Sequence, residues 1–293
     1  MVGRCNILCR GIMIVLAVCL CSCACAVPRT PVAGTLHGEV SWQGRVYLDG
    51  DVVLGEGSRL LIAPGSEIVF LPASEGRDLL TAHPNFPGSE LIIKGELVAE
   101  GSPAAPITFR YLDPRAPAGS WGGINLSQSP RASFRFCRFT QADSAVHSQE
   151  SKVFVEESLF ENNLVGIRFF SSEMLIENNL LRRNGTAIRF HFGSPVICRN
   201  EIVDNRRAFF FTSYPRDFHI RSNTIRGSSE YAVVLGEEVP DDVPMPENYW
   251  GTTDLAAIEA SFFDGRRTGY LGAVQVVPVL AAADERAGIS WNP

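Results

Sequence analysis

Apolar and polar residues alternate in short segments along most of the chain, and the segments recur at intervals of about 21 residues. In Ile188-Arg189-Phe190-His191 every second side chain is apolar, which is the period of a half-buried strand and not of a helix. Between residues 132 and 251 the segments can be aligned row by row, so that equivalent positions form columns. One of these columns is mostly polar. Its members, spaced by 21, 21, 21, 23 and 25 residues, are Cys137, Ser158, Asn179, Asn200, Asn223 and Asn248.

This repeat predicts a solenoid, because internal periods of 20 to 50 residues indicate a repeat architecture. The connections between segments are too short for a crossover helix, yet the aligned columns require parallel strands stacked about 4.8 Å apart. A coiling chain meets both demands. Asparagine tolerates left-handed backbone, and its amide can hydrogen-bond along a stack of identical turns. We therefore predict that the polar column is a structural ladder at a bend.

These repeats resemble those of the pectin-lyase-like superfamily. The segment from Asn248 to Asp254, with its Asn-Tyr-Trp-Gly, is similar to one that ends many bacterial members, and residues 49–54, 60–68 and 95–101 resemble their opening coils. The resemblance implies an all-β, right-handed parallel β-helix over residues 37–251. It does not imply one activity, because the superfamily holds lyases, hydrolases, epimerases and adhesins.

Residues 252–293 are expected to cap the last coil. Thr253 can act as N-cap of a helix over about 254–263, with Gly265 ending it. Residues 274–280 then form an extended strand against the last coils, and Pro278 indicates that this strand lies at an edge.

The first 26 residues have the pattern of a signal peptide: Arg4 and Arg10 precede the apolar run 12–20, which is too short to span a bilayer. Leu20-Cys21-Ser22-Cys23 resembles a bacterial lipobox, which makes Cys23 the expected lipidation site. Ala24-Cys25-Ala26 allows ordinary cleavage instead, releasing a soluble protein that begins near Val27. Residues 27–36 are expected to be a tether.

Composition adds few constraints. The net charge of −6 gives no reason to expect nucleic acid or an anionic membrane surface as partner. Phosphate-loop, dinucleotide-binding, zinc-helix and Gly-x-Ser-x-Gly motifs do not occur in the mature chain. The five histidines do not fall at metal-ligand spacing, so we expect no metal centre and regard them as surface residues.

Two cysteines remain after the signal peptide. Cys137 and Cys198 lie three coils apart in the alignment, roughly 14 Å at about 4.8 Å per coil. A disulfide requires Cα atoms within about 7 Å. We predict two unpaired thiols, with Cys137 acting as a small buried apolar side chain.

Polysaccharide lyases of the superfamily use Arg or Lys beside Ca²⁺-binding aspartates, and its hydrolases use clustered Asp side chains. The sequence shows neither cluster. Glu156 and Glu177 stack on adjacent coils, which allows a carboxylate pair or a Ca²⁺ site; a solvated strand face with ion pairs between coils is the competing interpretation.

One outward column carries two arginines, Arg168 and Arg189, followed by Phe210 and flanked by Phe170 and His191. Such a surface suits an acidic polysaccharide or another envelope protein, although a covering loop would also account for Phe210. We therefore expect an exported β-helix, lipid-anchored in the outer membrane or periplasm and otherwise secreted, that acts as a binding or scaffold protein. The alternative is a polysaccharide lyase or glycoside hydrolase on the same fold.

Overall fold

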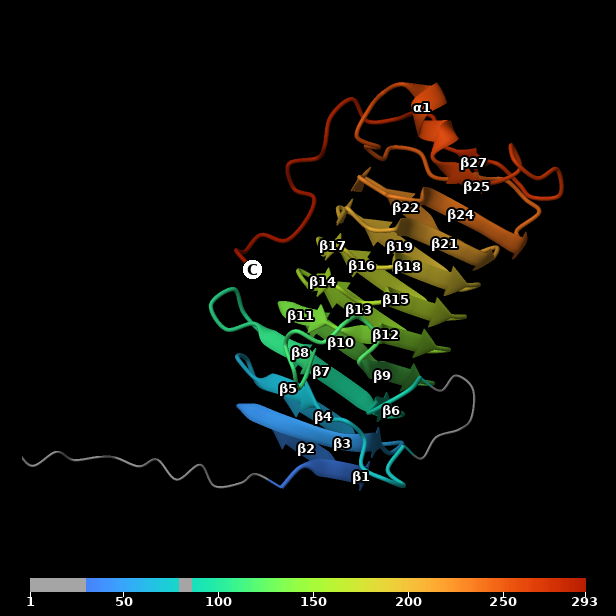
Figure 1. Ribbon diagram of the computed structural model, residues 1–293. Helices are drawn as coiled ribbons and strands as arrows, with labels where there is room; N and C mark the ends of the chain where they lie inside the picture. The colour runs from blue at the N-terminus through green and yellow to red at the C-terminus, as the bar shows by residue number, and fades with distance from the viewer. Residues whose placement is uncertain (1–29, 79–85) are drawn as a thin grey trace, which may run out of the picture.

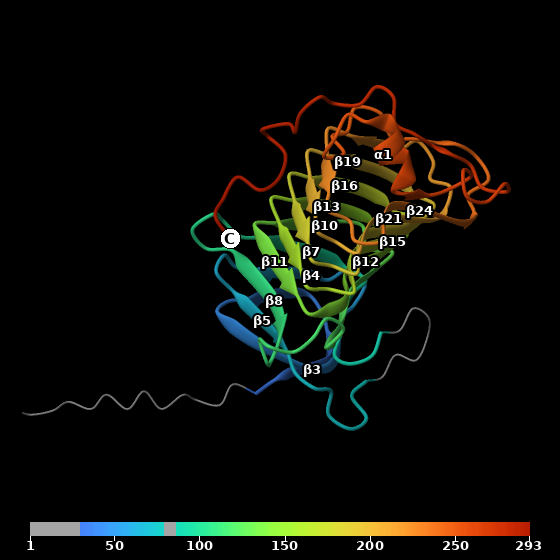
Figure 2. The same cartoon turned by 45° about the horizontal axis from the view of Figure 1, so that its top comes forward.

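The computed structural model describes residues 30–78 and 86–293. Within them the chain winds into a stack of coils whose strands pair in parallel with the equivalent strands of neighbouring coils (Figure 1). The all-β solenoid predicted from the repeat is confirmed. Three strand faces surround one core, and Figure 2 shows two of them on opposite sides of the coil.

The first face is an eight-stranded parallel sheet. Its strands in stacking order are β2 (Glu39–Trp42), β4 (Arg59–Ile62), β7 (Glu96–Glu100), β10 (Ala132–Arg135), β13 (Lys152–Glu156), β16 (Glu173–Glu177), β19 (Ser194–Cys198) and β22 (His219–Arg221).

The second and third faces are joined by β3 (Arg45–Leu54), which is long enough to contribute to both. The second face continues with β5 (Glu67–Phe70), β8 (Ile107–Tyr111), β11 (Cys137–Thr140), β14 (Leu159–Glu161), β17 (Leu180–Arg182), β20 (Glu201–Val203) and β23 (Thr224–Arg226). The third contains β1 (Val32–Leu36), β6 (Leu91–Ile93), β9 (Trp121–Ser127), β12 (Ala142–Gln149), β15 (Val165–Phe170), β18 (Thr186–His191), β21 (Arg207–Ser213), β24 (Tyr231–Glu238) and β26 (Phe262–Phe263).

In parts of the core, side chains of the same type stack on one another in successive coils. The rings of Phe109, Phe139 and Phe160 lie parallel, with centroids 4.9 and 4.5 Å apart. Aromatic side chains bury large apolar areas, so a repeated column of them supplies much of the energy that holds adjacent coils together. Alternation along each strand leaves the intervening side chains outside, where a site can form.

The polar column lies at the bend between the first and second faces, and all six residues are fully buried. Each ladder asparagine bonds to the next: Asn179 Nδ2 donates to Asn200 Oδ1 at 2.9 Å, and Asn200 Nδ2 to Asn223 Oδ1 at 2.9 Å. A second ladder, which was not predicted from the sequence, lies at the following bend. Its members, again 21 residues apart, are Asn163, Asn184 and Asn205.

The expected boundary at residue 37 was wrong, because Val32–Leu36 forms β1 and pairs with β3. Val32 and Leu36 pack on the core, so the expected tether includes the first strand. Signal segment 1–26, with Cys23, lies outside the described residues. Among the residues that are described, no helix is long and apolar enough to cross a membrane.

The cap differs in detail from the expectation. Helix α1 (Leu255–Ala260) has Asp254, not Thr253, as its N-cap, since the Asp254 carboxylate accepts from the N–H groups of Ala256 and Ala257. The helix ends at Ala260 with Ser261 as its C-cap, before Gly265, because Phe262 and Phe263 pair with β24 as β26. β27 (Val274–Gln275) pairs in parallel with β25 (Val243–Pro244), and backbone bonds from Glu247 and Leu280 extend that contact to residue 280.

The remaining residues, 281–293, form what we call the C-terminal strap, which runs back along the outside of the coils (Figure 1). Ile289 covers Leu159, Leu180 and Val203, which would otherwise face water. The indole of Trp291 donates to the Glu157 carbonyl at 2.7 Å. The end of the chain therefore contacts coils more than one hundred residues earlier in the sequence.

Candidate functional site

Two outward columns on the third face form the site. The cationic column runs across adjacent coils in the order His147, Arg168, Arg189 and Phe210. The neighbouring platform column, two residues further along each strand, contains Gln149, Phe170, His191 and Thr212. Because a strand alternates its side chains, the inward residues between them hold both columns against the core.

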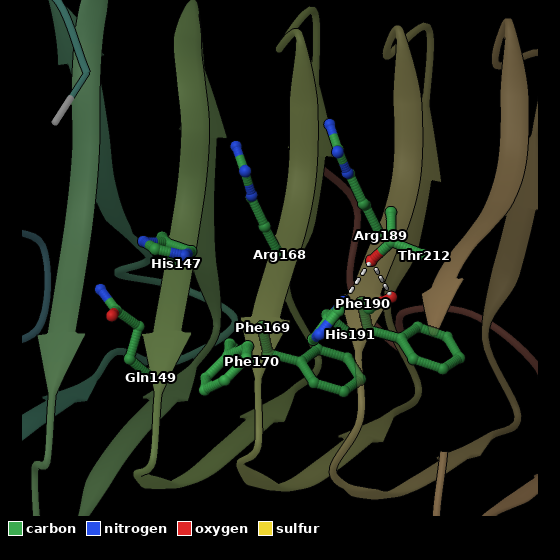
Figure 3. Close-up of a pocket in the computed structure, with 9 residues that line it drawn as sticks. All are labelled: His147, Gln149, Arg168, Phe169, Phe170, Arg189, Phe190, His191 and Thr212. Carbon is green, nitrogen blue, oxygen red and sulfur yellow. Dashed lines mark hydrogen bonds between the residues drawn. The ribbon is translucent and has the colours of Figure 1, made fainter. Parts of the chain in front are cut away.

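Between the columns lies a groove of about 380 Å³. Figure 3 shows Arg168 and Arg189 extending side by side from adjacent strands, with the Phe170 and His191 rings further along the same strands, on the side away from the guanidinium groups. The lining comprises His147, Gln149, Arg168, Phe169, Phe170, Arg189, Phe190, His191 and Thr212. Four of the five residues predicted for a binding face therefore meet in one depression.

Within residues 30–78 and 86–293, the two groove arginines have no carboxylate at ion-pair distance. Among the described residues no ion pair within 4 Å and no hydrogen bond involves Arg168 or Arg189, whereas most other arginines on the coils are paired with Glu or Asp. Burial, and after it the charge of Arg189, lowers the pKa of Arg168, while Asp143 opposes this shift. Burial followed by the charge of Arg207 lowers the pKa of Arg189, and Asp143 again opposes the shift. Asp143 therefore acts on both positive charges, but it forms no ion pair within 4 Å with either arginine.

Aromatic rings support both guanidinium groups. The Arg168 guanidinium lies 5.4 Å from the Phe86 ring centroid, and that of Arg189 lies 4.9 Å from the Phe210 centroid. Phe210 does not line the groove; it is half-buried between Arg189 and Arg207. Rings at these distances attract cations without neutralising them, so the groove keeps its charge.

Phe170 and His191 form an exposed aromatic platform beside the arginines. Their rings stack with centroids 5.2 Å apart and planes inclined by 15°, and Phe170 is 38% exposed. Thr212 Oγ1 donates to the Phe190 carbonyl and lies 3.3 Å from His191 Nδ1. At the rim, Glu238 Oε2 is 3.7 Å from His191 Nε2. A flat ring of this kind suits the apolar face of a sugar.

A chain of buried polar residues, which was not predicted from the sequence, leads to the groove. Glu90 Oε1 accepts from Asn125 Nδ2 at 2.8 Å, and Asn125 Oδ1 lies 2.7 Å from His147 Nδ1. All three side chains are at most 5% exposed, so regarding His147 as a surface histidine was wrong. Burial, followed by the charge of Asp51, raises the pKa of Glu90 to about 8.

Glu156 on β13 and Glu177 on β16 are neighbours across adjacent strands, as predicted from the alignment. Glu177 forms an ion pair with Arg199 and accepts from the thiol of Cys198, so it already has a counter-charge within the chain. Groups of three or more His, Cys, Asp or Glu side chains that could hold a metal ion are absent from residues 30–78 and 86–293.

Both described cysteines are unpaired, as predicted. Cys137 is fully buried, its Sγ lies 3.2 Å from the Ala99 carbonyl, and burial raises the pKa of its thiol. Cys198 is half-buried, and burial likewise raises the pKa of its thiol. Neither has the lowered pKa that activates a cysteine nucleophile.

Residues 116–238 match the model of a family described as right handed beta helix region. The matched segment contains both columns of the groove. Together with the parallel coils, the match shows that the chain is a right-handed β-helix repeat protein. No curated protein and no solved structure matches the chain significantly.

Proposed function

We propose that this β-helix is an exported protein of the cell envelope, anchored by lipid at Cys23, that binds an acidic polysaccharide in its groove. The observation that carries the proposal is the pair Arg168 and Arg189, stacked on adjacent coils without carboxylate partners among the described residues. Like charges on neighbouring strands repel each other, and a bound carboxylate or sulfate would relieve that repulsion.

The platform column favours a glycan over a simple anion as the ligand of the groove. A sugar carrying an acidic group can place that group on the guanidinium pair while its ring stacks on Phe170. The nine lining residues include no Asp or Glu, whereas glycoside hydrolysis requires a pair of carboxyl groups. This lining favours binding over hydrolysis.

The test is the double variant Arg168→Ala, Arg189→Ala, titrated with polygalacturonate and with an uncharged galactan. The parent should bind only the acidic polymer, more weakly as salt rises, since exposed charges are screened over about 10 Å at 0.1 M. The variant should lose about tenfold or more in affinity, because each charge-assisted hydrogen bond contributes roughly 1.5–3 kcal/mol.

Arg131→Ala, Arg135→Ala is the matched control, since it removes two exposed arginines from the first face, where each also lies over an aromatic ring. It should bind like the parent. Two results would contradict the proposal: the folded groove variant binds as well as the parent, or neither protein binds any of a panel of anionic glycans. A scaffold for another envelope protein would then be the better hypothesis.

The anchor has a separate test. Cys23→Ala should move the protein from the membrane fraction to the soluble fraction, because a bacterial lipoprotein carries several acyl chains and each buried CH₂ contributes about 0.8 kcal/mol. A parent protein that is already soluble and begins at Val27 would contradict lipidation while leaving the groove hypothesis intact.

A further inference from the structure

The buried chain Glu90–Asn125–His147 connects a carboxyl group inside the protein to the cationic column. Glu90 directly precedes β6, Asn125 lies on β9 and His147 on β12, three successive strands of the third face. Because Asn125 Nδ2 donates to Glu90 Oε1, its Oδ1 faces His147 and accepts from Nδ1. The bonds therefore have a fixed direction, from the imidazole through the amide to the carboxyl group.

The surroundings of Glu90 are built around this side chain. Gly122 leaves the space that it fills, since a Cβ there would come within 2.5 Å of Glu90 Cγ. Glu90 Oε2 is buried without a hydrogen-bond partner among the described residues. Asp51 on β3 and Asp78 after β5 add negative charge, whereas the Phe86 N–H and Asn125 favour the ionised form. A second negative charge beside Asp51 is costly, so near neutral pH the carboxyl group keeps its proton.

The far end of the chain lies in the site. His147 lines the groove, and its ring packs edge-on against Phe86 with ring centroids 5.2 Å apart. In the strand register, Arg168 is the equivalent residue on the next coil. The same Phe86 ring lies beneath the Arg168 guanidinium. A charge that appears on Glu90 is therefore separated from the cationic column by one amide group, in a region where low dielectric leaves charges poorly screened.

We propose that Glu90 is a proton-dependent switch of the groove: with a neutral carboxyl group the groove holds an anionic ligand, and loss of that proton weakens the binding. This inference rests on the proposed function, and it adds regulation of the same site. Ionisation lowers the net charge of the Glu90–His147 chain by one, which offsets part of the positive charge of Arg168 and Arg189. By linkage, a bound anion must in turn make Glu90 harder to ionise.

The experiment measures polygalacturonate affinity between pH 6 and 9.5 for the parent and for Glu90→Gln, which keeps the shape and the acceptor for Asn125 but cannot ionise. Parent affinity should fall by about fivefold or more as pH rises through about 8. Glu90→Gln should keep its neutral-pH affinity across that range. The control Glu173→Gln, at an exposed carboxylate of the first face, should follow the parent. An equal loss of affinity in Glu90→Gln and parent would overturn the switch.

A second measurement needs no glycan. In the parent, the NMR signals of the His147 ring should shift with the midpoint at which the Glu90 carboxyl carbon titrates, and Asn125→Ala should abolish that response. If no acidic glycan binds at any pH but the coupled titration is seen, the proposed function fails and the proton link stands. If glycans bind but His147 does not respond to Glu90, the switch is wrong and the proposed function stands.

Discussion

A ladder asparagine completes the hydrogen bonding of three successive coils. Asn200 Nδ2 donates to the Ile176 carbonyl on the coil before and to Asn223 Oδ1 on the coil after. Its Oδ1 accepts from the backbone and side chain of Asn179. Since Asn200 is fully buried, water cannot replace any of these bonds.

Replacing Asn200 by Leu should therefore destabilise the fold. The change leaves the Ile176 carbonyl and two N–H donors of Asn179 buried without partners, and each such group costs about 1–3 kcal/mol. We expect the free energy of unfolding from urea denaturation to fall by at least about 2 kcal/mol. Arg221→Leu, at an exposed outward position of β22, should change it by less than about 0.5 kcal/mol. Equal stability of both variants would contradict the ladder's role.

The residues whose place in the fold could be predicted from the sequence are those that recur at the repeat spacing. A 21-residue spacing identifies Asn179 and Asn200, and the same spacing in Asn163 and Asn184 would have revealed the second ladder. Arg168 and Arg189 follow from the same alignment. Glu90 does not, because it directly precedes β6, outside residues 132–251 where the repeat can be aligned.

Among whole elements, sequence patterns revealed neither β1 nor the C-terminal strap. Residues 281–293 have no strand assignment and no alternation, yet Ile289 and Trp291 close the outer side of the second face. The start and end of α1 were also displaced, since Asp254 competes with Thr253 as N-cap and β26 draws the following residues into the sheet. Such choices depend on neighbouring coils that a local pattern does not contain.

Trp291→Ala tests whether the strap stabilises the solenoid. Trp291 is 8% exposed, and its indole N–H donates to the Glu157 carbonyl. The Arg138 guanidinium lies 5.1 Å from the Trp291 ring centroid. Loss of a large buried ring should lower the free energy of unfolding by about 3 kcal/mol. Trp291→Phe, which loses the hydrogen bond and part of the ring, should cost less, about 1–2 kcal/mol. If thermal unfolding of Trp291→Ala matches the parent, the strap is only a surface attachment.

For the whole molecule, stability should depend on pH through carboxyl groups with opposite shifts. Burial would raise the pKa of Glu67, but hydrogen bonds from Arg110 and Arg45 outweigh it and hold the pKa below its usual value. Glu67 therefore adds stability at neutral pH that is lost as pH falls into the acid range. Glu90 acts in the other direction, because its pKa is raised.

Between pH 4.5 and about 8 Glu90 is protonated in the folded protein and ionised in the unfolded chain, so the folded state binds more protons. The free energy of unfolding must then fall as pH rises through this window, by at most about 5 kcal/mol for a shift of this size. Glu90→Gln cannot ionise in either state and should lose that part of the pH dependence, so its advantage over the parent should grow from pH 5 to pH 9. Urea unfolding at both values measures it. A constant difference between the two proteins would mean that Glu90 is ionised in the folded state as it is in the unfolded chain, and that Asp51 and burial do not keep its proton in place.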